Sequence, residues 1–183
     1  MSKIVAGINM TLDGVCDHTA VSPDEDVHQH YTDLLHDADT ILYGRITYEL
    51  MEYWRPFVIN PSGEESMDDF AKAIGKIHKI VFSHKLKNVD WDSAELSTKT
   101  LEDTINVLKQ KAGKDVLVGS RSLIIQLANL DLIDEFQICI HPVIAGKGML
   151  LFDQIDKRIN LKLVKTKIFD SGAIIHYYAR ATL

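Results

Sequence analysis

Three short segments of the sequence each place a small residue and a basic residue directly after an apolar run. They are residues 44–47 in "ILYGRITYEL", 83–85 in "KIVFSHKL" and 119–122 in "DVLVGSRSL". The start of a helix exposes unpaired N–H groups with partial positive charge, glycine permits close backbone approach, and Ser or Thr adds a donor. Such corners suit phosphate oxygens, and Arg45, Lys85 and Arg121 would supply the charge. Together they predict a site for a phosphorylated dinucleotide.

Each corner also has a purely structural explanation. A glycine at a strand-to-helix turn is often there because the backbone has a positive φ or because segments pack closely, and Ser or Thr is simply a good N-cap. No G-x-G-x-x-G is present, and "AGKGM" lacks both the upstream glycine and the Ser or Thr of a P-loop, which excludes two nucleotide-binding folds. The combination of three corners, and no single one, favours the binding site.

The segments that position these corners alternate between strand-like and helix-like patterns. "KIVAGINM", "TILYG", "HKIVFS" and "KDVLVGS" are short apolar runs, and the valine- and isoleucine-rich ones bounded by helices are typical of buried parallel strands. Helix starts are predicted at Ser22, with Pro23 in the first turn and Glu25 completing a capping box, and at Ser66 and Thr100. The apolar face of the first helix comprises Val27, Tyr31, Leu34 and Leu35. The stretch "FVINPSGEESMDD" is expected to be a surface excursion.

The last third of the chain changes character. "DEFQICIHPVIAG" alternates, with Phe136, Ile138 and Ile140 against Gln137, Cys139 and His141. "LKLVKTKIF" and "AIIHYYARA" follow, joined by "DSG", a hairpin-type connection. We therefore expect an α/β fold with a mostly parallel sheet that ends in an antiparallel C-terminal hairpin. Open sheets of this kind bind ligands outside the carboxyl ends of their strands, where the three corners lie.

Composition describes an ordinary globular chain and narrows the range of partners. The 183 residues, 46% hydrophobic and 25% charged, fit one domain over residues 1–183 that needs no disulfide, so Cys16 and Cys139 are expected to be free thiols. The formal charge of −6 with scattered basic residues argues against a nucleic-acid surface. The N-terminal apolar run is too short for a signal peptide or membrane span. We expect a cytoplasmic protein whose partners are small molecules, with no nucleic acid and no membrane.

Several motifs, in this order and spacing, make the chain resemble a known family along nearly its whole length. They are "TLDG", "LYGRITYE" with Trp54 downstream, "IVFSHKL", "VLVGS", "LIDEFQICIHPVIAGKGMLLF" and "GAIIHYYAR". The chain resembles the dihydrofolate reductase-like fold family, and within it the reductase (RibD C-terminal) domain of the riboflavin-biosynthesis deaminase-reductases and their stand-alone relatives. The resemblance implies a three-layer sandwich, use of NADPH, hydride transfer to a C=O or C=N carbon, and a homodimer.

The resemblance also implies where NADPH would bind. The phosphates would meet Gly44, Arg45 and Thr47. The adenosine 2′-phosphate would meet Ser83, with His84 or Lys85. The pyrophosphate would meet Gly119, Ser120 and Arg121. The nicotinamide is expected near "NMTLDG".

Candidate chemical groups lie near the expected nicotinamide. Asp13 is the first candidate for the proton donor, and its alternative is an Asp-Gly turn. His28 lies about where dihydrofolate reductases carry a substrate-binding acid, which counts against folate reduction, and its imidazole is a second candidate donor. Asn9 and Trp54 are the substrate-binding candidates. His28 and His30 point about 200° apart on a helix, so no metal site is predicted.

The substrate is less well defined than the cofactor. The resemblance suggests 5-amino-6-(5-phosphoribosylamino)uracil, reduced in riboflavin biosynthesis, although the H-x-E and P-C-x-x-C pattern of the partner zinc deaminase domain is missing. A ribose phosphate needs its own cation, for which Arg55, Lys147 and Arg158 are the candidates. The alternatives are another small carbonyl or heterocycle, a dihydrofolate reductase, or a nucleotide-binding protein without turnover.

Overall fold

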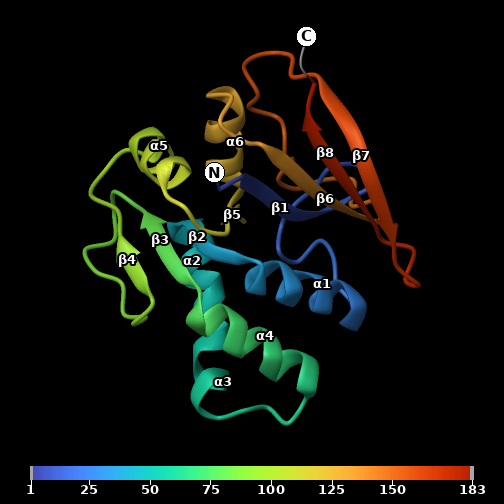
Figure 1. Cartoon of the computed structure of the whole chain (residues 1–183). Coiled ribbons are helices and arrows are strands. Elements are labelled where there is room, and N and C mark those ends of the chain that lie inside the picture. Colours follow the sequence, from blue (N-terminus) through green and yellow to red (C-terminus); the bar gives the residue numbers. More distant parts are fainter. Residues whose placement is uncertain (1, 182–183) are drawn as a thin grey trace.

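One mixed sheet organises the molecule (Figure 1). A computed structural model, which describes residues 2–181, gives eight strands in the order β4-β3-β2-β5-β1-β6-β8-β7. The strands are β1 (Ile4–Thr11), β2 (Ala38–Gly44), β3 (His78–Phe82), β4 (Ala94–Leu96), β5 (Asp115–Val118), β6 (Glu135–His141), β7 (Leu161–Ile168) and β8 (Ile174–Arg180). Neighbours from β4 to β6 are parallel, whereas β8 runs antiparallel to β6 and β7 to β8. The predicted sheet is confirmed; only the short β4 was not anticipated.

Helices cover both faces of the sheet, as Figure 1 shows. The helices are α1 (Glu25–His36), α2 (Arg45–Met51), the 3-10 turn η1 (Glu52–Trp54), α3 (Arg55–Ile59), α4 (Glu65–Lys76), α5 (Leu101–Gln110) and α6 (Arg121–Asn129). One apolar core lies between the sheet and α5 and α6, and another between the sheet and α1 to α4. The result is the expected three-layer arrangement.

Central strands are apolar on both sides because both sides are covered. In β2, Leu42 packs into the α5–α6 core while Ile41 and Tyr43 pack into the core beneath α4. Each such side chain contributes roughly 1.5–3 kcal/mol when it is fully buried. This two-sided burial produces the continuous apolar runs seen in the sequence and fixes where each strand ends.

Helix starts were predicted with mixed success. Thr100 is the N-cap of α5, and its hydroxyl accepts from Asp103 N at 3.1 Å, as expected. The start predicted at Ser22 is wrong, because Asp24 caps α1 by accepting from Val27 N at 2.9 Å. The start predicted at Ser66 is one residue late, because α4 begins at Glu65.

The stretch expected to be a surface excursion is mostly helical. Its two ends belong to α3 and α4, so only residues 60–64 connect them. Asp68 in the first turn of α4 accepts from Ser62 N at 2.7 Å and from Gly63 N at 3.1 Å. This carboxylate folds the connection back onto the helix, which shortens the loop.

The polar side of β6 is buried, although its alternating pattern is also typical of a strand with one solvated face. Cys139 is 0% and His141 5% exposed, and Gln137 is buried as well. The residues around Cys139 that form this part of the core come from α1, the β7–β8 turn and β8, including Val27, Phe169 and Tyr177. Polar groups at the carboxyl end of β6 are therefore held inside the fold.

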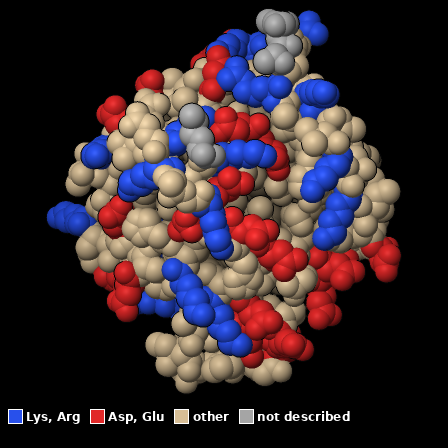
Figure 2. All heavy atoms as spheres, viewed as in Figure 1, with Lys and Arg blue, Asp and Glu red and all other residues tan. Residues whose placement is uncertain are grey.

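The C-terminal hairpin forms as predicted. Phe169 N donates to Ala173 O at 2.9 Å, and Gly172 adopts a φ of 83° that favours glycine at this tight turn. All eight residues of β7 are exposed. Figure 2 shows acidic and basic side chains interleaved over one face of the molecule. Within residues 2–181, no helix is long and apolar enough to cross a bilayer.

Candidate functional site

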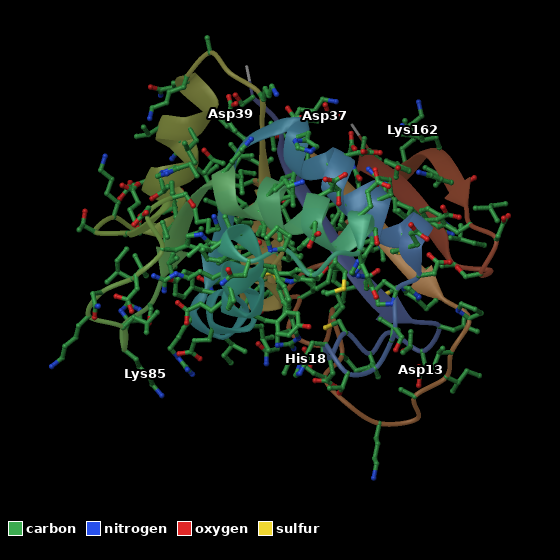
Figure 3. All side chains as sticks on the ribbon, turned by 90° about the horizontal axis from the view of Figure 1, so that it is seen from below. Asp13, His18, Asp37, Asp39, Lys85 and Lys162 are labelled. Atoms are coloured by element: carbon green, nitrogen blue, oxygen red, sulfur yellow. The ribbon has the colours of Figure 1, made fainter. Side chains whose placement is uncertain are left out.

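The strand ends predicted to bind a ligand share one edge of the molecule (Figure 3). Figure 3 places Asp13, His18 and Lys85 along this edge and Asp37, Asp39 and Lys162 along the opposite one. Asp13 follows β1 and Lys85 follows β3, whereas Asp39 lies near the start of β2. The carboxyl ends of the parallel strands therefore point the same way, as the sequence predicted.

Two of the three corners are in direct contact. Gly44 N donates to the buried Ser120 Oγ at 2.8 Å, which joins the end of β2 to the start of α6. A Cβ on Gly44 would lie 3.2 Å from Ser122 Oγ, and one on Gly119 would lie 3.6 Å from the Tyr43 ring. The glycine at position 44 therefore permits a close approach of the start of α6, whereas a Cβ on Gly119 would make an ordinary van der Waals contact.

The helices at these two corners begin without a capping side chain. Asp24 and Thr100 cap α1 and α5, but neither Gly44 before α2 nor Ser120 before α6 caps its own helix. Thr47, in the first turn of α2, is half-buried. Uncapped first turns suit the oxygen atoms of an anion. They lie side by side because β2 and β5 are neighbours.

The basic side chains at the corners differ in their availability. Arg45 donates to both carboxylate oxygens of Glu49, at 3.0 and 2.8 Å, in an exposed pair. Arg121 donates to Leu150 O at 2.6 Å and pairs with Asp153, so it fastens residues 150–153 to the start of α6. Arg121 is thus occupied in this structure, while an exposed pair such as Arg45 with Glu49 contributes only about 0.3–0.5 kcal/mol.

The third corner, after β3, is built as a turn. Ser83 Oγ accepts from Lys85 N and Leu86 N, both at 3.0 Å. His84 and Lys85 are exposed. The Ser83 hydroxyl therefore shapes the turn, and the two basic side chains are the groups left to meet a ligand.

Asp13 holds a loop beside the end of β1. Its carboxylate accepts from Thr11 Oγ1 at 2.6 Å, Ala145 N at 3.0 Å and Gly146 N at 2.7 Å. These bonds, the Thr11 hydroxyl first, lower the pKa of Asp13 to about 2. An ionised, fully bonded carboxylate is a poor proton donor at neutral pH. The donor role of Asp13 stays a prediction, and the geometry favours its role in the loop.

His28 and Trp54 belong to an aromatic cluster. The His28 ring stacks on Phe70 with centroids 5.7 Å apart and lies edge-on to Trp54 at 5.8 Å. Burial lowers the pKa of His28, and the Asp24 carboxylate opposes this shift. Trp54 is buried and packs against Phe57 and Phe70. Trp54 therefore supports His28 from within the core.

The sequence reasoning missed His141 as a site residue. Its Nε2 lies 2.9 Å from Asn9 Oδ1 and 3.5 Å from Cys139 Sγ. In the parallel register, His141 is paired with Thr11 and Cys139 with Asn9. A signal existed, because a histidine at the carboxyl end of a strand next to the first strand must lie near "NMTLDG". Among residues 2–181, no group of three or more His, Cys, Asp or Glu side chains is arranged to hold a metal ion.

The chain resembles known proteins along nearly its whole length. The model of the RibD C-terminal domain matches residues 2–175. YyaP, an uncharacterized protein of Bacillus subtilis, is 35% identical over 176 residues, which cover 94% of this chain and 92% of YyaP.

Two solved structures show the same fold. A protein assigned to riboflavin biosynthesis in Shewanella sp. PV-4 has a TM-score of 0.74 at 19% identity, covering 98% of this chain and 99% of that one. The diaminohydroxyphosphoribosylaminopyrimidine deaminase/5-amino-6-(5-phosphoribosylamino)uracil reductase of Thermotoga maritima has a TM-score of 0.64 at 15% identity. The match covers 98% of this chain but 57% of the Thermotoga protein.

Proposed function

This chain belongs to the RibD C-terminal domain family, and from that premise we propose that it is an NADPH-dependent reductase of a small carbonyl or heterocyclic substrate. The observation that carries the proposal is the pair of uncapped helix starts joined by the bond from Gly44 N to Ser120 Oγ. Phosphate oxygens accept from such N–H groups and gain from the helix dipoles. The Thermotoga relative is named as a reductase as well.

The basic residues at the strand ends differ in how readily they could bind a phosphate of the cofactor. Arg45 needs only to exchange its exposed partner Glu49 for a phosphate, which costs little. Lys85 and His84 are exposed beside the next strand end. Arg121 would have to leave Asp153 and Leu150 O, so it serves the site by holding residues 150–153 in place.

The bound cofactor would supply a hydride, and the chain would position the acceptor carbon and supply a proton. Asn9 and His141, at the ends of β1 and β6, line the place expected for the nicotinamide and the substrate. The substrate would be a C=O or C=N compound, with the pyrimidine named for the Thermotoga enzyme as the first to test.

The test has two stages. NADPH is first added to the protein, and binding is followed by nicotinamide fluorescence and thermal shift. Oxidation of NADPH is then measured with 5-amino-6-(5-phosphoribosylamino)uracil and, separately, with dihydrofolate. Binding with oxidation supports the reductase. Binding with no oxidation by any carbonyl or imine substrate identifies a nucleotide-binding protein, and no binding of NADPH refutes the proposal.

A pair of substitutions tests the cofactor site itself. Arg45→Ala should weaken NADPH at least tenfold, because a guanidinium–phosphate pair contributes about 1.5–3 kcal/mol, and it should weaken NADH much less if Arg45 meets the 2′-phosphate. Glu49→Gln frees Arg45 and should strengthen NADPH binding severalfold. Lys72→Ala, which breaks an exposed ion pair on α4 with Asp69, is the matched control. Equal losses of NADPH and NADH in Arg45→Ala would place the 2′-phosphate elsewhere.

A further inference from the structure

We infer that His141 is the group of this site that carries the transferable proton, with Nδ1 as the working atom and Asn9 as the residue that fixes its orientation. This inference rests on the proposed function and names a residue for its protonation step. It starts from the polar cluster at the carboxyl ends of β1 and β6, which comprises Asn9, Cys139 and His141.

The orientation of the Asn9 amide selects the nitrogen of His141 that keeps its proton. An amide oxygen can only accept, so with Oδ1 turned toward the ring, 2.9 Å from Nε2, the proton belongs on Nε2. The neutral ring then has its lone pair on Nδ1. No hydrogen bond to Nδ1 occurs among residues 2–181, and Nδ1 is not one of the fully buried unpartnered atoms. Although His141 is only 5% exposed, Nδ1 is the ring nitrogen that has no partner among residues 2–181, and it is the one that a ligand at the end of β1 would meet.

Cys139 contributes no charge to this pair. Burial raises the pKa of the Cys139 thiol to about 12, so it is neutral at physiological pH. A neutral, fully buried thiol is no nucleophile, which excludes a Cys–His catalytic pair. Cys139 packs beside the Nε2 side of the ring at 3.5 Å and leaves proton exchange to Nδ1.

Asp24 is the charged group that acts on His141. As the N-cap of α1 it is ionised, because bonds from the Ser171 hydroxyl and Val27 N lower its pKa. Burial lowers the pKa of His141, while the charge of Asp24 raises it. The net shift is downward, so the imidazolium of His141 releases its proton more readily than that of an ordinary histidine. Among residues 2–181, Asp24 is the charged group that acts appreciably on His141.

The other two candidate proton donors, Asp13 and His28, are held differently. Asp13 is ionised and fully bonded to Thr11 and residues 145–146. The His28 ring stacks on Phe70, and neither of its nitrogens has a hydrogen bond that fixes a tautomer among the described residues. Of these three candidates, His141 is the one that has both an orienting bond and a ring nitrogen without a hydrogen-bond partner among residues 2–181.

A bound nicotinamide would supply a hydride, with both electrons, for the carbon of a C=O or C=N bond. The oxygen or nitrogen of that bond takes the Nδ1 proton of the His141 imidazolium. His141 is left neutral with its Nε2 proton still donated to Asn9, and a proton from solvent restores the imidazolium.

An NMR titration of labelled histidine Cε1–H tests the inference without any substrate. The variant His141→Gln identifies the resonance. Asn9→Asp places a carboxylate on Nε2–H and should raise the His141 midpoint by about one pH unit, and Asp24→Asn, which keeps a good N-cap, should lower it. Asn106→Asp on the exposed side of α5 is the matched control and should leave the midpoint unchanged. The inference is overturned if Asn9→Asp leaves the His141 midpoint unchanged, or if His141 does not titrate between pH 4 and 9.

Turnover provides the second readout. His141→Gln should lower kcat about 10²–10⁴-fold with NADPH affinity within twofold, and Asn9→Asp should move the kcat–pH profile in the direction of the NMR midpoint. His78→Gln, at the opposite edge, should leave kcat unchanged. Full kcat in His141→Gln overturns the inference while the reductase stands. Failure of the unmodified protein to bind NADPH refutes the proposed function instead, and the titration still reports on His141.

Discussion

The backbone N–H of Gly44 donates to Ser120 Oγ at 2.8 Å across 76 positions of sequence, and Ser120 is 1% exposed. The bond fastens the end of β2 to the start of α6. Ser120→Ala leaves a buried N–H without an acceptor, which costs about 1–3 kcal/mol. We expect that loss in the free energy of unfolding, measured by urea denaturation.

Ser122→Ala is the control for this substitution. Ser122 is exposed and two residues away, so its loss should change stability by less than about 0.5 kcal/mol. Equal stabilities of Ser120→Ala and Ser122→Ala would mean that the Gly44–Ser120 bond contributes nothing.

Asp13→Asn tests the loop-holding role of this carboxylate. The folded-state pKa of about 2 lies below the ordinary 3.8, so the stabilisation is present above pH 3.8 and is lost as the pH falls toward 2. The unmodified protein should therefore lose melting temperature over this interval more steeply than the variant. At neutral pH the variant should lower turnover while NADPH affinity persists, because residues 145–146 are held less firmly. Parallel melting curves from pH 4 to pH 2 would refute this role.

Much of the site's framework could be predicted because it depends on local patterns. The apolar runs before Gly44, Ser83 and Gly119 set the strand ends, and the rule for parallel sheets placed these ends on one edge. What each side chain does there depends on distant residues. Arg121 is held by Leu150 O and Asp153, about 30 positions away, which no local pattern reveals.

The polar side of β6 shows the same limit. A period of two separates Ile138 and Ile140 from Cys139 and His141, but it does not say whether a helix covers the second side. Here α1 covers it, so the polar side chains became an interior cluster. Asn9 was named as a candidate from the sequence, whereas His141 required the register between β1 and β6.

Lys79→Met should stabilise the protein. Lys79 is 0% exposed; its amine donates to Ile77 O at 3.0 Å and Ser93 Oγ at 2.7 Å and lies over the Trp91 ring. Burial lowers its pKa from 10.5 to about 8, a penalty on the charged form of about 3 kcal/mol at most. The penalty is complete below pH 8 and fades as the pH rises toward 10.5.

Denaturation of Lys79→Met and the unmodified protein at several pH values measures this effect. The variant should be the more stable by about 1–3 kcal/mol at pH 7, with the difference shrinking between pH 8 and 10. Lys76→Met, an exposed lysine on α4, should show no such pH dependence. A constant difference across the range would show that Lys79 is not destabilised by its charge.

The exposed apolar residues of strand β7 predict that the chain associates with itself. Within residues 2–181 the strand pairs only with β8, and its four apolar residues are between 37 and 71% exposed: Leu161, Leu163, Val164 and Ile168. Leu163 stands opposite Tyr178 and Ile168 opposite Ile174, so they share one apolar face of the hairpin. Lys165 and Lys167 lie over the Tyr177 and Phe169 rings, and Figure 1 places the hairpin at the outer edge of the sheet.

We expect a second copy of the chain to cover this apolar face, as the resemblance implies, because an uncovered face of this kind marks an interaction surface. Light scattering during size exclusion should show a dimer, and Leu163→Glu with Ile168→Glu should convert it to a monomer. The melting temperature extrapolated to low concentration should change little, since both side chains are exposed. Val107→Glu, an exposed apolar residue on α5, should leave the dimer intact. A monomer at high micromolar concentration of the unmodified chain, or a dimer that survives both glutamates, would place any association elsewhere.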